Sequence, residues 1–143
     1  MRLEALVETV KPLPIEFEVI DRETGETKIE VLNLKYRPNA YTPRLEEESA
    51  RAQSTGKAGD MLKAMLIPLI ASWDMTHEVA QVDAEGKPVT KDGKQAIKLE
   101  VLPITMDSFD DVPLSVLSKI LGAVAEDITP SKQSQPSLEG SFS

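Results

Sequence analysis

The clearest pattern in the chain is an alternation of apolar and polar residues, which is the period of a half-buried β-strand. It runs through 15–21, where glutamates alternate with apolar residues, and it returns in 27–36 after a turn that contains Gly25. Two alternating runs around a short glycine-containing loop predict a β-hairpin over 15–36. Because an isolated hairpin is only marginally stable in water, we expect it to pack against another part of the chain.

Residues 1–14 allow two interpretations. Their apolar residues have helical spacing, but Pro12 and Pro14 would stop a helix. The segment is therefore either a short helix or a strand-like arm that leads into the hairpin.

Helices are predicted over 42–75. Thr42 followed by proline is typical of a helix N-terminus, and a polar helix is expected over 44–53. A more hydrophobic helix with one broad apolar face is expected over 58–73. Pro68 lies inside it and should kink or split it. This second helix is the predicted centre of the core.

The rest of the chain reads as an insertion, a helix and a tail. Two glycine-containing turn signals make 79–102 a polar hairpin or a long flexible loop. A C-terminal helix is predicted over 107–127, with Asp107 or Ser108 as its cap. The serine- and proline-rich segment 129–143 has too few apolar residues for a core, so a disordered tail is expected there.

Together these elements predict the α+β class. We expect a single domain over 1–128, with the N-terminal β-hairpin packed on a small helical domain. A chain of 143 residues is long enough to bury one ordinary core. Two apolar helices and a hairpin make that core thin, so self-association into a homo-oligomer is also expected.

Composition narrows the classes of partner. The chain has 16 basic and 24 acidic residues, a net charge of −8, and no cysteine. A field of this sign repels a phosphate backbone, so no nucleic acid partner is expected. The longest apolar stretch, 65–71, falls well short of the ~20 residues that span a bilayer, so no membrane partner is expected.

The only histidine gives little support for a metal or catalytic site. His77 has Asp74 and Glu78 within one turn of it, but a closed metal site needs three or four converging donors. No motif of a nucleophilic triad or of a phosphate-binding loop accompanies it. We therefore expect His77 to lie in a solvated loop.

Two further acidic groups have structural explanations. In the polar insertion, Lys87 occupies a position where a helix–loop–helix calcium motif requires an oxygen ligand, so its carboxylates indicate turns; these are Asp83, Glu85 and Asp92. The second group lies where a helix is expected to begin, and a helix N-terminus favours negative charge; its members are Asp107, Asp110 and Asp111. The sequence thus predicts no catalytic residue, no metal site, no cofactor and no enzyme.

What remains is a set of apolar positions that could bind other proteins. Trp73 is either a core residue or an interface anchor, since aromatic residues are common in both places. Nearby methionines adapt to varied partners. The predicted protein-binding residues are Met61, Met65, Leu69, Trp73, Leu114, Leu117 and Leu121.

Several short motifs follow one another along the chain between 34 and 113. The hairpin ends in Leu-Lys-Tyr-Arg-Pro at 34–38, and a Thr-Pro helix start follows at 42–43. Ser-Trp-Asp at 72–74 ends the hydrophobic helix. After the polar insertion come Leu-Pro-Ile-Thr at 102–105 and a final helix with an early proline, Pro113. In this order the motifs resemble those of the tail assembly chaperones of long-tailed, siphovirus-type bacteriophages.

The resemblance covers 30–130 and implies a non-enzymatic chaperone. Such a protein binds the tape measure protein and helps recruit tail tube subunits in the host cell cytoplasm, and it is absent from the mature virion. The alternative is a structural virion component such as a head–tail connector or a tail completion protein. A small-molecule or regulatory binding domain, with apolar helices lining a pocket, is a third interpretation.

Overall fold

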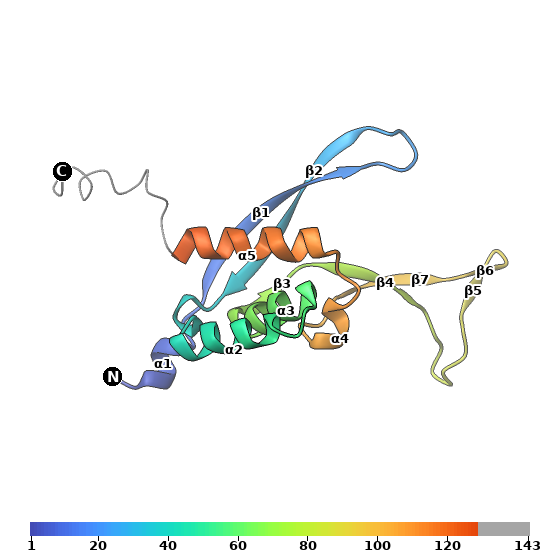
Figure 1. Ribbon diagram of the computed structural model, residues 1–143. Coiled ribbons are helices and arrows are strands. Elements are labelled where there is room, and N and C mark those ends of the chain that lie inside the picture. The colour runs from blue at the N-terminus through green and yellow to red at the C-terminus, as the bar shows by residue number, and fades with distance from the viewer. Residues whose placement is uncertain (129–143) are drawn as a thin grey trace.

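The computed structural model describes residues 1–128, and the tail predicted at 129–143 lies outside the described residues. The fold is centred on a three-stranded antiparallel sheet in the order β1–β2–β3 (Figure 1). The strands are β1 (Lys11–Ile20), β2 (Thr27–Tyr36) and β3 (Ile70–Trp73). Helices pack against this sheet, and the predicted α+β class is confirmed.

The β1–β2 hairpin forms where it was predicted, but β1 starts earlier. Residues 1–14 contain both alternatives, since α1 (Leu3–Val7) is a short helix and the strand begins at Lys11. Pro12 and Pro14 pair opposite Lys35 and Asn33 of β2. An edge strand tolerates proline because the missing N–H groups can face the open edge.

The turn of this hairpin is fixed by Asp21. Its carboxylate accepts hydrogen bonds from the backbone N–H groups of Glu23 at 2.8 Å and Thr24 at 3.3 Å. These bonds stabilise the charged form and lower the pKa of Asp21 below its ordinary value. Gly25 has a φ of 73°, a conformation that glycine adopts without strain.

The first long helix confirms its predicted cap. A short 3-10 helix, η1 (Pro38–Ala40), leads into α2 (Pro43–Gln53). The Thr42 hydroxyl accepts the backbone N–H of Leu45 at 3.2 Å, which satisfies one of the free donors at the start of α2. Leu45 and Ser49 are the buried residues of α2, which packs along α3 (Ala58–Leu69).

The prediction of one helix over 58–73 is wrong at its C-terminal end. The helix ends just after Pro68, which cannot donate a backbone hydrogen bond, and the next four residues form β3. In β3, Ile70 pairs with Tyr36 and Trp73 pairs with Leu34. The change from helix to strand adds a third strand to the sheet and buries Ile70 and Trp73.

The polar insertion is a hairpin, one of its two predicted forms, and it begins earlier than 79. It consists of β4 (Thr76–Ala80) and β7 (Ile97–Val101), with β5 (Thr90–Lys91) and β6 (Lys94–Gln95) near its tip. We call residues 76–101 the β4–β7 arm. It projects from the body on the same side as the outer half of the β1–β2 hairpin (Figure 1).

The C-terminal helix predicted over 107–127 is two helices, α4 (Met106–Phe109) and α5 (Leu114–Ile128). The expected cap at Asp107 or Ser108 is also wrong. Thr105 caps α4, and its hydroxyl accepts the backbone N–H of Ser108 at 3.2 Å. The turn before Pro113 separates the two helices, and α5 lies across the sheet (Figure 1).

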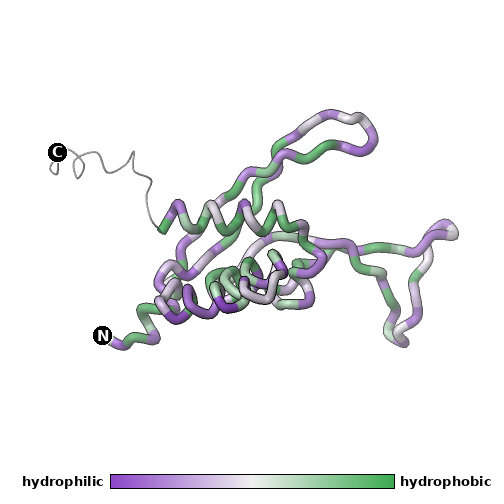
Figure 2. The backbone as a smooth tube through the Cα atoms, in the orientation of Figure 1, coloured by the Kyte–Doolittle hydropathy of each residue, from purple (hydrophilic) through white to green (hydrophobic). Residues whose placement is uncertain are grey.

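The core lies between the sheet and helices α3, α4 and α5. Hydrophobic residues concentrate there, while apolar and polar residues alternate along the two projecting hairpins (Figure 2). The Tyr36 hydroxyl donates a hydrogen bond to the Asp127 carboxylate and so ties the end of α5 to β2. Side chains with no more than 1% exposure are Tyr36, Leu66, Leu69, Phe109, Leu117, Ile120 and Val124.

Candidate functional site

Most residues of the predicted binding stripe lie in the core. Four of them are buried, with exposed fractions of no more than 9%; these are Met65, Leu69, Trp73 and Leu117. Met61 and Leu121 are partly buried and pack against the same core. Leu114, at the start of α5, is 51% exposed. The stripe therefore stabilises the fold, and a partner could reach its buried members only if the core opened.

Trp73 joins the core to the β4–β7 arm. Its indole Nε1 donates a hydrogen bond to the carbonyl oxygen of Leu102 at 2.7 Å. Its ring stacks on Phe109, with 5.1 Å between the ring centres. Leu102 immediately follows β7 and its backbone N–H donates to Met75 at 2.7 Å, so this cluster closes the root of the arm.

The residues around His77 do not form a metal site. His77 lies on strand β4 and is exposed, which corrects the predicted loop. The Asp74 carboxylate accepts two hydrogen bonds from Asn33, one from the backbone N–H at 2.8 Å and one from the side-chain Nδ2 at 3.0 Å. Within residues 1–128 no three histidine or acidic side chains are grouped so that they could hold a metal ion.

The other acidic groups take part in turns and ion pairs. Asp83 accepts the backbone N–H groups of Glu85 and Lys87, as expected of a turn residue. Asp92 has a φ of 54° in the turn before β6. Asp110 is paired with the ammonium group of Lys63, which raises the pKa of Lys63 above its ordinary value.

A groove lies between the two projecting hairpins. Three adjoining hollows form it, and all three are lined by Val116 of α5. Their volumes are about 390 Å³ at the arm root beside α4, about 470 Å³ between β1 and α5, and about 330 Å³ between β2 and β4. The hollow between β2 and β4 shares Phe17 with the hollow between β1 and α5, and it shares Met75 with the hollow at the arm root. We call this continuous surface the inter-hairpin groove.

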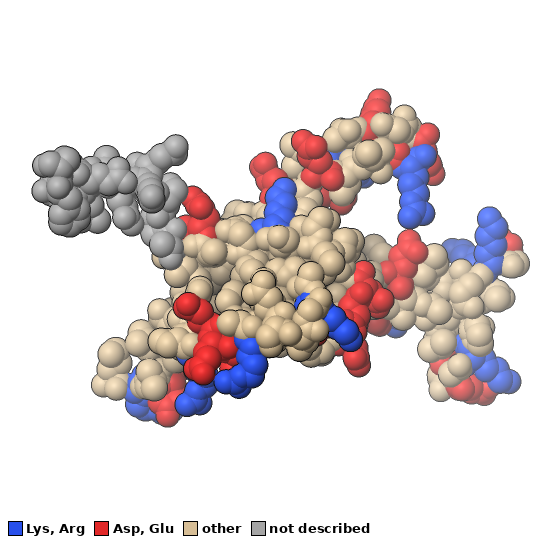
Figure 3. Space-filling view, viewed as in Figure 1, with Lys and Arg blue, Asp and Glu red and all other residues tan. Residues whose placement is uncertain are grey.

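The groove combines apolar lining with acidic residues. Its apolar residues include Phe17, Val19, Met75, Val112 and Val116. Acidic side chains gather where the central body meets the β4–β7 arm, and others lie along the β1–β2 hairpin (Figure 3). The acidic residues that line the hollows are Glu16, Glu18, Glu30, Asp74, Asp107 and Asp111.

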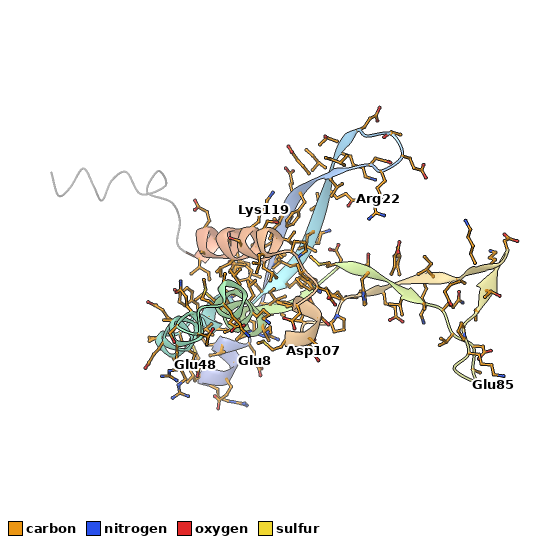
Figure 4. The ribbon with its side chains drawn as sticks, turned by 45° about the vertical axis from the view of Figure 1, so that its right-hand side comes forward. Glu8, Arg22, Glu48, Glu85, Asp107 and Lys119 are labelled. Atoms are coloured by element: carbon orange, nitrogen blue, oxygen red, sulfur yellow. The ribbon has the colours of Figure 1, made fainter. Side chains whose placement is uncertain are left out.

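Lys119 is the one lysine or arginine that lines these hollows. It rises from α5 beside the β1–β2 hairpin, whereas Asp107 lies at α4 (Figure 4). The Lys119 Nζ is 4.7 Å from the centre of the Phe17 ring, a cation–π geometry. The charge of Lys119 is thus directed at an aromatic ring of the groove.

The hairpins also expose apolar side chains outside the groove. On the β1–β2 hairpin, Ile20 is 71% exposed and lies outside the groove, whereas Ile29, which is 61% exposed, lines the hollow between β1 and α5. On the β4–β7 arm, alternate residues of β7 form one exposed row; these are Ile97, Leu99 and Val101. Such contiguous exposed apolar residues are typical of surfaces that bind other proteins.

Sequence reasoning missed the groove because distant segments build it. Phe17, Met75 and Val116 come from a strand, a connection and a helix, and none of them belongs to a motif. The early break at Pro68 was the one local signal, since ending the helix there creates β3 and leads the chain into the arm.

Comparison with known proteins identifies no relative of this chain. No protein family model, no curated protein and no solved structure matches this chain. In the part of the chain that the structure describes, every helix is too short or too polar to cross a membrane.

Proposed function

We propose that this protein is a non-enzymatic tail assembly chaperone of a long-tailed bacteriophage. In this role it binds the tape measure protein and helps recruit tail tube subunits. It acts in the cytoplasm of the host cell and is absent from the mature virion. The motifs between 34 and 113 support the family, and the inter-hairpin groove supports a protein-binding role.

The observation that carries the proposal is the groove itself. Apolar surface that is open to solvent between two projecting hairpins suits a protein partner more than a small molecule, because the three hollows adjoin one another instead of enclosing a single cavity. A net charge of −8 keeps a chain with exposed apolar residues soluble until it meets its partner. Both features are useful to a chaperone that must bind and later release an apolar client.

Co-expression tests the proposal. The tape measure protein of the same genome is expressed alone and together with this chain, and its soluble fraction is measured by gel densitometry after centrifugation. We expect co-expression to raise the soluble fraction several-fold and the two proteins to co-purify. An unchanged soluble fraction would contradict the chaperone role.

Two variants of α5 link that result to the groove. Val116→Asp places a charge on the lining shared by all three hollows and should abolish the gain in solubility. Ser118→Asp adds the same charge two positions later, at an exposed residue outside the three hollows, and should retain the gain. Circular dichroism confirms that each variant is folded.

Mass spectrometry of purified particles separates the chaperone from the structural alternative. A connector or tail completion protein would be found in a fixed ratio to the tail proteins. A chaperone that leaves before maturation would be missing from the particles but present in the infected-cell lysate.

A further inference from the structure

We propose that the inter-hairpin groove binds a basic amphipathic helix, one that presents apolar side chains on one face and lysines or arginines along its flanks. This inference rests on the proposed function in that it names the chemistry of the client segment. It is carried by the charge and the layout of the groove, which are independent of any resemblance.

The charge of the groove is strongly one-sided. Six acidic residues and a single lysine line the three hollows. The lysine, Lys119, lies over the Phe17 ring. Acidic side chains that lie beside a partly desolvated apolar surface attract a cationic partner more strongly than the same groups in open water.

Several of these carboxylates are available to a partner. Asp74 is hydrogen-bonded to Asn33, and Glu30 lies 3.9 Å from Lys28. The other four form no salt bridge with any residue of the described chain; these are Glu16, Glu18, Asp107 and Asp111. Lysines or arginines of a partner would complete ion pairs that the described part of the protein leaves unmade.

The layout of the groove favours a helix. An amphipathic helix buries side chains at successive turns, at positions i, i+3 or i+4, and i+7, with a rise of about 5.4 Å per turn. The three hollows adjoin one another around Val116 and so offer successive places for such side chains. Acidic residues line every hollow of the row, from Glu16 at the β1–β2 hairpin through Glu30 to Asp111 at the turn before α5.

Synthetic peptides test the inference on the full chain. Three fluorescent peptides of about 18 residues, long enough for about five helical turns, are compared by anisotropy. The first is an amphipathic leucine–lysine helix, the second replaces each lysine with glutamate, and the third scrambles the first so that no apolar face remains. We expect the first to bind at least about tenfold more tightly than the third, and the second to show no binding.

Two charge-reversal variants locate the binding. Glu18→Lys combined with Asp111→Lys alters exposed residues of the groove and should weaken the basic peptide about tenfold, a change of about 1.4 kcal/mol. Glu48→Lys combined with Glu126→Lys makes the same change in net charge at exposed residues outside the hollows and should alter binding less than about twofold. Glu48 lies on α2, away from the two projecting hairpins (Figure 4).

Each outcome decides the inference. Equal binding of the basic helix and its scrambled form, or equal weakening by both double variants, would overturn it, since either result means attraction by net charge alone. Preferred binding of the acidic helix would overturn it as well. The failure of the proposed function is distinguishable. If the basic helix binds as expected but the tape measure protein stays insoluble, the groove inference holds and the chaperone role does not.

Discussion

The β1–β2 hairpin and the β4–β7 arm share a local pattern but differ in burial. Both alternate apolar and polar residues and both turn at glycines with positive φ. In β2, Leu32 and Leu34 are 7% and 2% exposed, whereas in β7, Ile97 and Leu99 are 56% and 68% exposed. The difference teaches that alternation specifies a strand, while a third strand and covering helices decide whether its apolar face enters the core.

The largest expected effect comes from exchanging equivalent leucines for alanine in the two hairpins. Leu34→Ala removes a buried side chain that contacts the core and should lower the free energy of unfolding by about 3 kcal/mol. Leu99→Ala should change it by less than about 0.5 kcal/mol, because the side chain is exposed. Urea unfolding followed by circular dichroism measures both. Equal losses would mean that the arm contributes to the core as much as the sheet does.

The next effect concerns the residue that connects the arm to the core. Trp73→Phe keeps an aromatic ring beside Phe109 but removes the indole N–H that donates to Leu102. Because the Leu102 carbonyl is then left without its donor, the free energy of unfolding should fall by about 2 kcal/mol. Hydrogen exchange should accelerate more in β4 and β7 than in β1 and β2. If exchange in the arm is unchanged, the Trp73–Leu102 bond does not hold the root of the arm.

A smaller, pH-dependent effect is expected where α5 holds the root of the β1–β2 hairpin. Asp127 accepts a hydrogen bond from Tyr36 and lies 2.9 Å from the Nζ of Lys11, and both contacts lower the pKa of its carboxyl below the ordinary 3.8. The charged form is therefore favoured by folding. Its stabilisation is present above pH 3.8 and is lost as the pH falls through the lower pKa of the folded state.

Asp127→Asn tests that contribution. At neutral pH the variant should be less stable by about 1.5 kcal/mol, since a hydrogen bond to a charged group and an ion pair are weakened together. As the pH falls through the lowered pKa of Asp127, the two proteins should converge in stability. Glu126→Gln, an exposed neighbour without a salt bridge in the described chain, is the control and should show no such convergence. A pH-independent difference for Asp127→Asn would contradict this account.

The same comparison explains how much of the structure the sequence could predict. The β1–β2 hairpin and the capped start of α2 depend on local patterns, and both were found. The strand β3 was missed because its apolar spacing also fits a helix, and only pairing with β2 decides between them. The predicted binding stripe includes Leu69 and Leu117, which are buried in the core. The sequence cannot separate the two cases, because an apolar stripe has the same spacing whether it faces a core or a partner. The groove depends on three segments brought together by the fold, so no local pattern could reveal it.

The smallest expected effect on stability comes from shortening the arm. The Gln81 N–H donates to the Ala96 carbonyl at 2.8 Å, so these two residues face each other across the ribbon. Replacing 82–95 with Asn-Gly should close the arm with a two-residue turn. Of the removed residues only Val89 is even partly buried, so the free energy of unfolding should change by less than about 0.5 kcal/mol.

Shortening the arm also separates its two possible roles. Residues 82–95 line none of the three hollows of the inter-hairpin groove, so the shortened protein should bind the basic amphipathic peptide with unchanged affinity. A shortened protein that is stable and binds the peptide would place the outer arm outside both the core and the groove. A loss of stability comparable to that of Leu34→Ala would instead show that the outer arm helps to hold the sheet. In that case the two hairpins would differ in exposure but not in their contribution to folding.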